Sequence, residues 1–219
     1  AENGNFVDSI NGYVTKTTGS VPTVANGSGY AIEFKGSGNY LDVVGSNEFG
    51  AMRNFVLAFD IKTQKGATYT LFDKYGVSGE NSLYVDIDQG NLRVIIGNKT
   101  LKFSYANHNI CDGSWHSIKI IVDTDNSSVT VYFDNEKQGS GAINAQQVAA
   151  TTQLLRIGTN RKGQYAYVGL MDNISMTPIH GTAVPETVKP ESISLNKVNT
   201  AIRVGENERL VATLSPSES

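Results

Sequence analysis

Apolar and polar residues alternate most clearly between Trp115 and Phe133. Apolar side chains recur at every second position from Ile118 to Val122 and again from Val129 to Phe133, and a polar segment separates the two runs. Period-two alternation interrupted by a polar turn is typical of two half-buried antiparallel strands. Because an isolated hairpin is only marginally stable in water, we expect this hairpin to lie inside a larger sheet.

Similar alternation recurs along the chain up to residue 177. It predicts strands over 12–18, 30–35, 39–44, 54–63, 69–74, 81–88, 92–96, 101–105, 154–158 and 167–176, in addition to the hairpin above. The segments 30–35 and 39–44 are expected to pair as a hairpin, and one helical turn is expected over 46–52. Many short strands without an amphipathic helix predict an all-β fold, a two-sheet antiparallel jelly-roll sandwich.

The composition changes at Pro178. The segment 178–190 contains further prolines and no period, which is typical of a linker. Three short apolar segments follow, at 192–196, 202–204 and 210–214, and they resemble the first strands of a second β domain. We therefore expect a jelly-roll module over 1–177, a linker over 178–190 and the start of another domain over 191–219.

Charge and composition restrict the class of partner. The net charge of −3 disfavours binding to a phosphate backbone, which requires a basic face. No apolar run approaches the roughly 20 residues of a membrane-spanning helix. The single cysteine, Cys111, excludes an internal disulfide and is interpreted as a small, partly buried apolar residue. We expect no nucleic-acid partner, no membrane insertion, and a monomer within a multidomain chain.

Four motifs occur in a distinctive order, namely Tyr30–Val43 (YAIEFKGSGNYLDV), Phe55–Lys62, Asp112–His116 (DGSWH) and Gly169–Ile174 (GLMDNI). Their order and spacing resemble those of laminin-G-like, concanavalin A-like lectin domains over about residues 28–177. The resemblance implies a jelly roll. It leaves the ligand open, because enzymes, lectins and adhesion modules all use this fold.

A narrower motif, Gly158–Gly163 (GTNRKG), precedes two tyrosines. It resembles the sialic-acid-binding modules found ahead of bacterial sialidase catalytic domains (carbohydrate-binding family 40). The resemblance implies that Arg161 pairs with a sugar carboxylate and that Tyr167 packs on the ligand. The Glu-x-Arg pair of that family is absent, and Ile95-Ile96-Gly97 stands in the corresponding stretch. The ligand-binding candidates are Arg161, Tyr167, Tyr165, Tyr84, Arg93 and Ile95.

The alternative for Arg161 is a surface arginine stacked on a neighbouring tyrosine, and the sequence leaves both interpretations open. Trp115, the only tryptophan, is interpreted as a core or sheet-edge residue rather than a sugar platform. Residues 189–219 resemble the start of bacterial immunoglobulin-like (group 2) domains. That resemblance implies a secreted or cell-surface bacterial protein with several domains.

Candidate catalytic groups are sparse. Asp86 and Asp88 share one face of a predicted strand, about 7 Å apart, and are interpreted as polar residues on a solvated face. The pattern of two glutamates and an aspartate that jelly-roll glucanases carry is absent. His108 and His116 lie near Cys111, but a single loop with one aspartate is a weak signal for a catalytic or metal site.

No cofactor is required by the sequence. Sandwiches of this kind often hold a structural calcium through carboxylates and backbone carbonyls, because Ca²⁺ takes six to eight oxygen ligands. Asp172 and Asp42 are the candidate ligands. The alternative for Asp172 is a carboxylate that caps backbone N–H groups.

Together these observations predict a non-catalytic carbohydrate-binding module of a secreted bacterial protein. It would direct an attached glycosidase, such as a sialidase, to host glycans, with sialic acid as the favoured ligand. One alternative is a laminin-G-type adhesion module that binds protein ligands. The other is a degenerate glucanase-like glycosidase.

Overall fold

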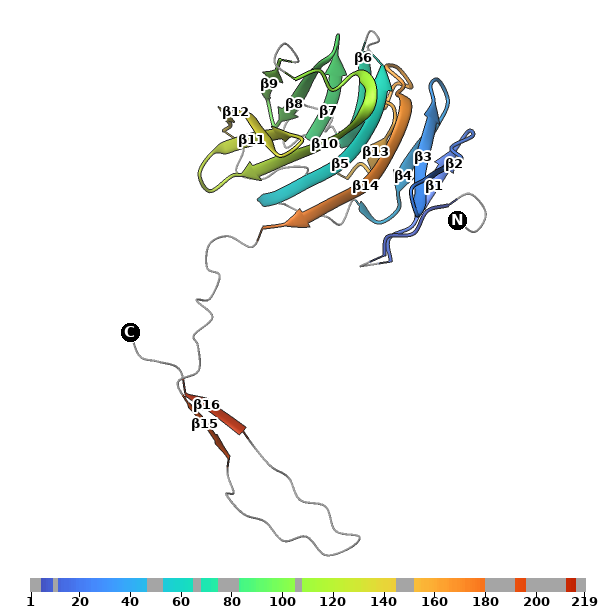
Figure 1. Ribbon diagram of the computed structural model, residues 1–219. Helices are drawn as coiled ribbons and strands as arrows, with labels where there is room; N and C mark the ends of the chain where they lie inside the picture. Colours follow the sequence, from blue (N-terminus) through green and yellow to red (C-terminus); the bar gives the residue numbers. More distant parts are fainter. Residues whose placement is uncertain are drawn as a thin grey trace, which may run out of the picture. The chain divides into compact units, whose positions relative to one another are not determined.

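The computed structural model describes residues 5–9, 12–46, 53–64, 68–74, 83–104, 108–144, 152–179, 192–195 and 212–215. The chain divides into two units, Ala1–Ile179 and His180–Ser219. The described residues contain strands and no α-helix (Figure 1). Consequently none of them belongs to a helix with the length and apolar character needed to cross a membrane.

The first unit is a sandwich of two seven-stranded antiparallel sheets, the jelly roll that the strand pattern predicts. One sheet, called the β7 sheet, has the order β1-β4-β13-β6-β7-β8-β9. Its strands are β1 (Thr15–Thr18), β4 (Tyr40–Val43), β13 (Leu155–Ile157), β6 (Thr68–Lys74), β7 (Leu83–Asp88), β8 (Asn91–Ile96) and β9 (Lys99–Phe103).

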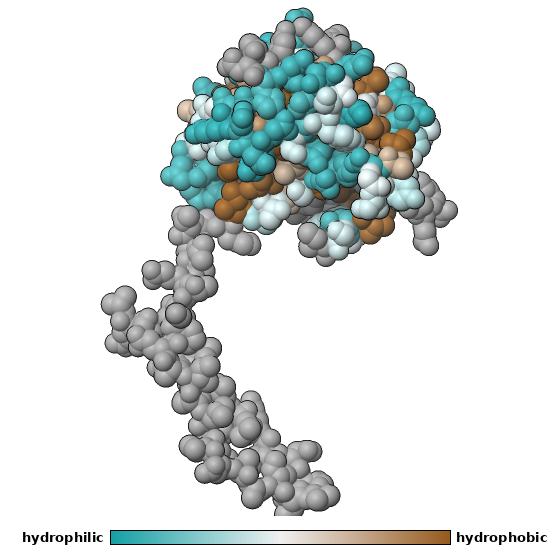
Figure 2. All heavy atoms as spheres, in the orientation of Figure 1, coloured by the Kyte–Doolittle hydropathy of each residue, from teal (hydrophilic) through white to brown (hydrophobic). Residues whose placement is uncertain are grey.

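The other sheet, called the β5 sheet, has the order β12-β11-β10-β5-β14-β3-β2. Its strands are β12 (Glu136–Ala142), β11 (Ser128–Phe133), β10 (Asp112–Asp123), β5 (Asn54–Gln64), β14 (Val168–Pro178), β3 (Gly29–Lys35) and β2 (Thr23–Asn26). Teal and white spheres cover most of the face seen in Figure 2, and brown spheres gather in separate patches.

The core lies between the sheets and is built by the inward positions of the alternating strands. On β5 these are Phe55, Leu57, Phe59 and Ile61, each at most 1% exposed, as the sequence predicts. The ring of Phe59 meets that of Phe72 on β6 with 4.8 Å between centroids, so aromatic contact joins the two sheets directly.

The hairpin at 115–133 is confirmed as β10 and β11. Ile118 faces Phe133 and Asp123 faces Ser128 across an unbroken register. β10 also pairs with β5 over its whole length, apart from an irregularity between Asp112 and Trp115. The hairpin therefore lies inside a larger sheet, as its low stability in isolation requires.

The predicted hairpin between 30–35 and 39–44 is wrong. Both segments are strands, but β3 pairs with β2 and β14 in one sheet while β4 pairs with β1 and β13 in the other. The connection through Gly36 and Gly38, with φ of +88° and +79°, crosses between sheets. Alternation identifies the buried face of a strand, and both sheets bury their faces against the same core, so the pattern alone did not distinguish pairing from crossing.

The second unit contributes the strands β15 (Ser192–Leu195) and β16 (Ala212–Ser215), which pair antiparallel. The predicted strand at 202–204, most of the predicted linker and most of the predicted helical turn at 46–52 lie outside the described residues. The immunoglobulin-like assignment of 191–219 stays a prediction.

Candidate functional site

Most of the sequence-predicted ligand residues lie on or beside the outward face of the β7 sheet, called here the polar face. Its central row crosses five strands by direct cross-strand pairing. The order of the row is Asp42, Arg156, Asp73, Tyr84 and Ile95. Asp86 and Arg93 form part of the next row, two residues along their strands. The sheet register thus brings Tyr84, Arg93 and Ile95 together.

Ion pairs neutralise most of the charge on the polar face. Arg156 donates from Nε and Nη2 to the two carboxylate oxygens of Asp42 at 2.9 and 3.0 Å, and its guanidinium lies 3.9 Å from the ring centroid of Tyr40. Arg93 donates in the same forked way to Asp86, with 2.8 Å between Nε and Oδ1. Such bidentate pairs fix both partners.

The prediction that Asp86 lies on a solvated face is wrong, because its side chain is fully buried. Burial raises the pKa of Asp86, and the hydrogen bonds from Arg93 oppose that rise. Asp88 accepts hydrogen bonds from Thr68 and Lys102 at 3.1 and 3.3 Å. Neither carboxylate is therefore presented as an acid or nucleophile.

Arg161 lies in a loop between β13 and β14 that its own motif stabilises. The Asn160 side chain accepts hydrogen bonds from the N–H groups of Lys162 and Gln164 at 3.0 and 2.8 Å. Thr159 donates its hydroxyl to the carbonyl of Gln164 at 2.9 Å. The Thr-Asn part of the motif therefore shapes the loop, and this positions Arg161.

The Arg161 side chain is 26% exposed and lies between two carboxylates. Its backbone N–H donates to Asp73 at 2.8 Å, its Nη2 donates to the Asp73 carbonyl at 3.4 Å, and its Nη1 lies 4.0 Å from Asp42. Its Nε, which is buried, has no hydrogen-bond partner among the described residues. Burial lowers the pKa of Arg161, and Arg156 lowers it further. The guanidinium therefore already makes contacts inside the protein, with the Asp73 carbonyl and the Asp42 carboxylate.

The predicted role of Tyr167 is wrong. Its ring is fully buried and packs edge-on against Phe34 and Tyr69, with centroids 5.8 Å apart in both cases. Its hydroxyl donates to the Leu170 carbonyl at 3.0 Å. Tyr167 follows Arg161 by only six residues in the sequence, but its ring points into the core and away from the Arg161 loop. Tyr165 is 52% exposed, whereas Tyr84 is 9% exposed and hydrogen-bonded to Thr70 at 2.7 Å.

A cleft of about 780 Å³ opens between the two sheets, beside β1, β4 and β13 on one side and β2, β3 and β14 on the other. This volume falls in the usual range for small-ligand sites, about 300–1,000 Å³. Apolar side chains outnumber polar ones in its lining. The lining comprises Phe6, Val7, Asp8, Tyr13, Thr15, Thr23, Tyr30, Ile32, Leu41, Val43, Ile157, Asp172, Asn173 and Ile174.

Tyr30 is the most exposed aromatic side chain among the described residues that line the cleft, at 70% of its surface. Asp172 accepts hydrogen bonds from the Asn26 side chain at 2.7 Å and from the Asn173 N–H at 2.8 Å. The sequence prediction did not single out the cleft, because its walls come from six strands and the segment before β1, at both ends of the jelly-roll unit. The unusual exposure of Tyr30 was not visible from alternation, which places this residue on the inward face.

The two calcium candidates belong to different sheets. Asp42 is held by Arg156 on the polar face, and Asp172 lines the cleft. The capping alternative for Asp172 agrees with the hydrogen bond from the Asn173 N–H. A calcium site at either carboxylate stays a prediction.

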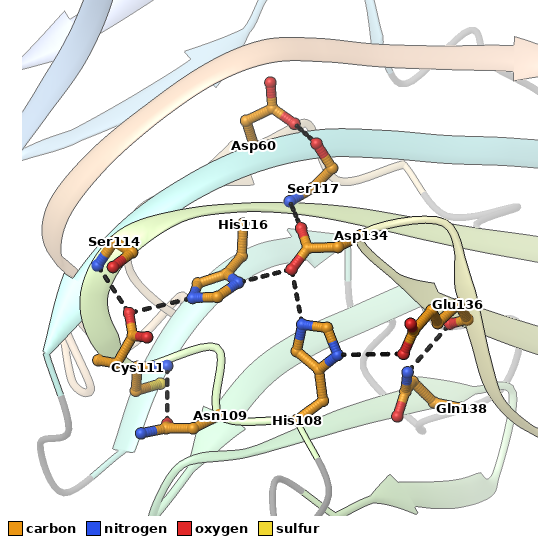
Figure 3. A network of polar contacts seen from close by, with 11 residues as sticks. Asp60, His108, Asn109, Cys111, Ser114, His116, Ser117, Asp134, Glu136 and Gln138 are labelled. Atoms are coloured by element: carbon orange, nitrogen blue, oxygen red, sulfur yellow. Dashed lines mark hydrogen bonds and ion pairs between the residues drawn. The ribbon is translucent and has the colours of Figure 1, made fainter.

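A histidine cluster is the group that the sequence prediction undervalued. Asp134, in the turn after β11, reaches both histidines with one oxygen, Oδ2 (Figure 3). The oxygen lies 2.6 Å from His108 Nε2 and 2.7 Å from His116 Nδ1. The available signal was the β10–β11 register, which folds residue 134 back beside Ser117.

The electrostatics of this cluster follow from its hydrogen bonds. Burial lowers the pKa of His116, but the hydrogen bonds to Asp134 and Asp112 reverse this and leave it raised. Burial raises the pKa of Asp134, and hydrogen bonds from His116, the Ser117 N–H and His108 leave it lowered. The Ser114 N–H and His116 lower the pKa of Asp112 to about 2.

Comparison with known proteins identifies the family to which the fold belongs. Residues 35–178 match a family model described as the concanavalin A-like lectin/glucanases superfamily. No curated protein sequence matches the chain.

Three solved structures illustrate the similarity. Domain 4 of an extracellular arabinanase from Geobacillus stearothermophilus, in complex with arabinotriose, is 17% identical with a TM-score of 0.62, covering 81% of this chain and 88% of that one. The receptor-binding domain of a botulinum neurotoxin C/D mosaic is 17% identical with a TM-score of 0.61, covering 78% and 44%. The binding domain of botulinum neurotoxin DC in complex with SialylT is 12% identical with a TM-score of 0.59, covering 80% and 48%. The chain spans less than half the length of the toxin domains, and these identities establish the fold alone.

Proposed function

Because this chain belongs to the concanavalin A-like lectin/glucanases superfamily, we propose that its jelly-roll unit binds glycans, without cleaving them, in the cleft lined by Tyr13 and Tyr30. The observation that carries the proposal is the ring of Tyr30, 70% exposed, at a cleft that also presents Asp172 and Asn173. Flat aromatic faces pack against sugar rings, and carboxylate and amide groups hydrogen-bond with hydroxyls.

Two similar structures support a sugar ligand. The arabinanase domain is in complex with arabinotriose, and one toxin binding domain is in complex with SialylT. Both have the sandwich architecture of this chain, although they share little sequence with it. The matched region covers 88% of the arabinanase domain and 48% of the toxin domain, so the arabinanase complex is the stronger support.

The charge of the cleft favours a neutral glycan. Asp8 and Asp172 both line it, and no Lys or Arg is among the described residues that do so. An acidic sugar placed there would bring its carboxylate near two others, which is unfavourable. Sialic acid, the ligand that the GTNRKG motif implies, would instead need Arg161, and there the guanidinium already contacts the Asp42 carboxylate and the Asp73 carbonyl.

The carboxylate pair that the sequence offered for catalysis, Asp86 and Asp88, does not support cleavage. Glycosidases use two carboxyl groups that flank the scissile bond. Asp86 is fully buried and paired with Arg93, and Asp88 is hydrogen-bonded to Thr68 and Lys102. Neither group lies among the described residues that line the cleft.

Binding in an open cleft through a few polar contacts and one or two rings gives weak affinity, in the millimolar to high-micromolar range. Such affinity becomes effective when several modules act together in one protein. A secreted bacterial parent in which this module directs a glycosidase, such as a sialidase, to host glycans fits that requirement.

The test is a glycan array of neutral, sulfated and sialylated glycans probed with the whole chain and two variants. Tyr30→Ala removes the exposed ring, and Arg161→Ala removes the guanidinium. Loss of one stacking contact, about 0.5–1.5 kcal/mol, predicts about 2–13-fold weaker binding for Tyr30→Ala. Tyr165→Ala, which removes an exposed ring outside the cleft lining, is the matched control.

Binding of neutral glycans that only Tyr30→Ala weakens supports the cleft. Binding of sialosides that only Arg161→Ala abolishes refutes the cleft and supports the sialic-acid prediction. An array with no signal, from a chain whose fold is intact by circular dichroism, refutes glycan binding and favours the adhesion alternative with protein ligands.

A further inference from the structure

Three segments converge on the oxygen Oδ2 of Asp134. His108 comes from the connection between β9 and β10, His116 from β10, and Asp134 from the turn between β11 and β12. The ligating atoms His108 Nε2, His116 Nδ1 and Asp134 Oδ2 all lie within 4.8 Å of one another. Figure 3 shows both imidazole rings pointing at the same carboxylate.

A neutral His116 cannot donate to both of its carboxylate neighbours. A neutral imidazole carries one N–H donor, and its second nitrogen is an acceptor. His116 has a carboxylate oxygen at each nitrogen, Asp134 at 2.7 Å and Asp112 at 3.1 Å. His108 has Asp134 at 2.6 Å and Glu136 at 3.7 Å. Three carboxylates around two rings thus leave room for additional positive charge.

The outer contacts match those of a metal centre. Histidines that ligate a metal usually donate their other N–H to a carboxylate, which fixes the ring and its tautomer. Asp112 occupies that place for His116, and Glu136 lies nearest to it for His108. The second oxygen of Asp134 accepts the Ser117 N–H at 2.7 Å. His116 and Asp134 therefore each have an outer hydrogen-bond partner, and His108 has Glu136 within ion-pair distance.

We propose that His108 Nε2, His116 Nδ1 and Asp134 Oδ2 bind a divalent transition-metal ion, with Zn²⁺ as the best match. Two imidazoles and one carboxylate suit zinc, whereas Ca²⁺ requires six to eight oxygens. In tetrahedral zinc sites the ligand atoms lie about 2.0–2.2 Å from the ion and hence roughly 3.3 Å apart. The two contacts of Asp134 need to lengthen by roughly 0.7 Å, within the reach of side-chain rotation.

The proposed ion would link the segment between β9 and β10, which carries His108, to the β10–β11 hairpin, which carries His116 and is followed by Asp134. His108 and His116 are 19% and 10% exposed, and Asp134 is 36% exposed, so water has access to a fourth coordination position. Metal that binds only the folded chain stabilises it. At a free Zn²⁺ concentration a hundredfold above Kd, we expect the unfolding midpoint to rise by about 5–10 °C.

The test uses the untagged whole chain, stripped with a chelator and titrated calorimetrically with ZnCl₂. We expect one equivalent to bind and the unfolding temperature to rise, and we expect CaCl₂ to produce neither effect. His108→Gln and His116→Gln should each abolish stoichiometric binding. Glu136→Gln, at a group 78% exposed, leaves packing intact and should weaken binding by about 10-fold or more.

The control is His180→Gln, which removes the third histidine of the sequence and should leave the titration unchanged. Zinc that binds equally well to both cluster variants refutes the site. So does a chain that shows no saturable binding at neutral pH. Glu136 is exposed, so Glu136→Gln leaves the fold intact even if the histidine variants unfold. An unchanged zinc affinity for this variant refutes the role of Glu136 beside His108.

Discussion

The Asp86–Arg93 ion pair offers the most direct test of how paired charges on the polar face stabilise the fold. Arg93→Met removes both donors of a forked hydrogen bond and leaves a carboxylate with no exposed surface. Breaking a buried pair on one side typically costs about 3–5 kcal/mol, because the remaining charge is uncompensated. Replacing both partners, as in Asp86→Leu with Arg93→Met, removes that charge. We expect the double variant to be more stable than Arg93→Met by at least about 2 kcal/mol.

Urea unfolding followed by the fluorescence of Trp115 measures this difference, since the only tryptophan lies in β10 of the jelly roll. Burial already raises the pKa of Asp86, and loss of Arg93 removes the main opposing influence. A pKa that is raised in the folded state gives stability at low pH that is lost as the pH rises through it. The loss of unfolding free energy in Arg93→Met, relative to the wild type, should therefore shrink as the pH falls from 7 to about 5. A deficit below about 1 kcal/mol, or a double variant that is less stable than the single one, would refute the reasoning.

Four further substitutions test the packing around the GTNRKG loop. Gly158→Ala should destabilise the fold by about 2–4 kcal/mol, since φ is +97° and a Cβ would lie 2.5 Å from the Phe34 ring; Gly163→Ala, with φ of +70° in open space, should cost only about 1–2 kcal/mol in the same urea assay. Burial lowers the pKa of Lys74 to about 8, so the wild type should gain thermal stability relative to Lys74→Met as the pH rises from 7 to about 9.5, and a constant difference would contradict this. Tyr167→Phe should lose about 0.5–1.5 kcal/mol with one hydrogen bond and leave glycan binding unchanged; weaker binding would restore its predicted role.

The strands were predictable because each carries its own alternation. The β10–β11 register and the buried faces of β5 and β7 follow directly from period two. Pairing was less accessible, as the separation of β3 from β4 shows, because either partner satisfies the same buried face. The pattern specifies which side of a strand is apolar and leaves its neighbours open.

The candidate sites were harder to predict, for two physical reasons. Alternation treats an outward residue as solvated, whereas the polar face buries Asp86 and Tyr84 through charge pairing and cross-strand contact. A site assembled from distant segments has no local signal. His108 and His116 were noticed, but Asp134 lies 18 residues beyond His116 and joins them only through the hairpin.

The placement of the last two strands of the jelly roll has a consequence for its biosynthesis. β13 lies between β4 and β6, and β14 lies between β3 and β5, so the end of the module supplies an interior strand of each sheet. A nascent chain that has emerged only as far as residue 150 still lacks both of these interior strands. We expect such a ribosome-bound intermediate to expose unpaired strand edges, to require chaperone protection and to fold only after release of residue 178 from the exit tunnel.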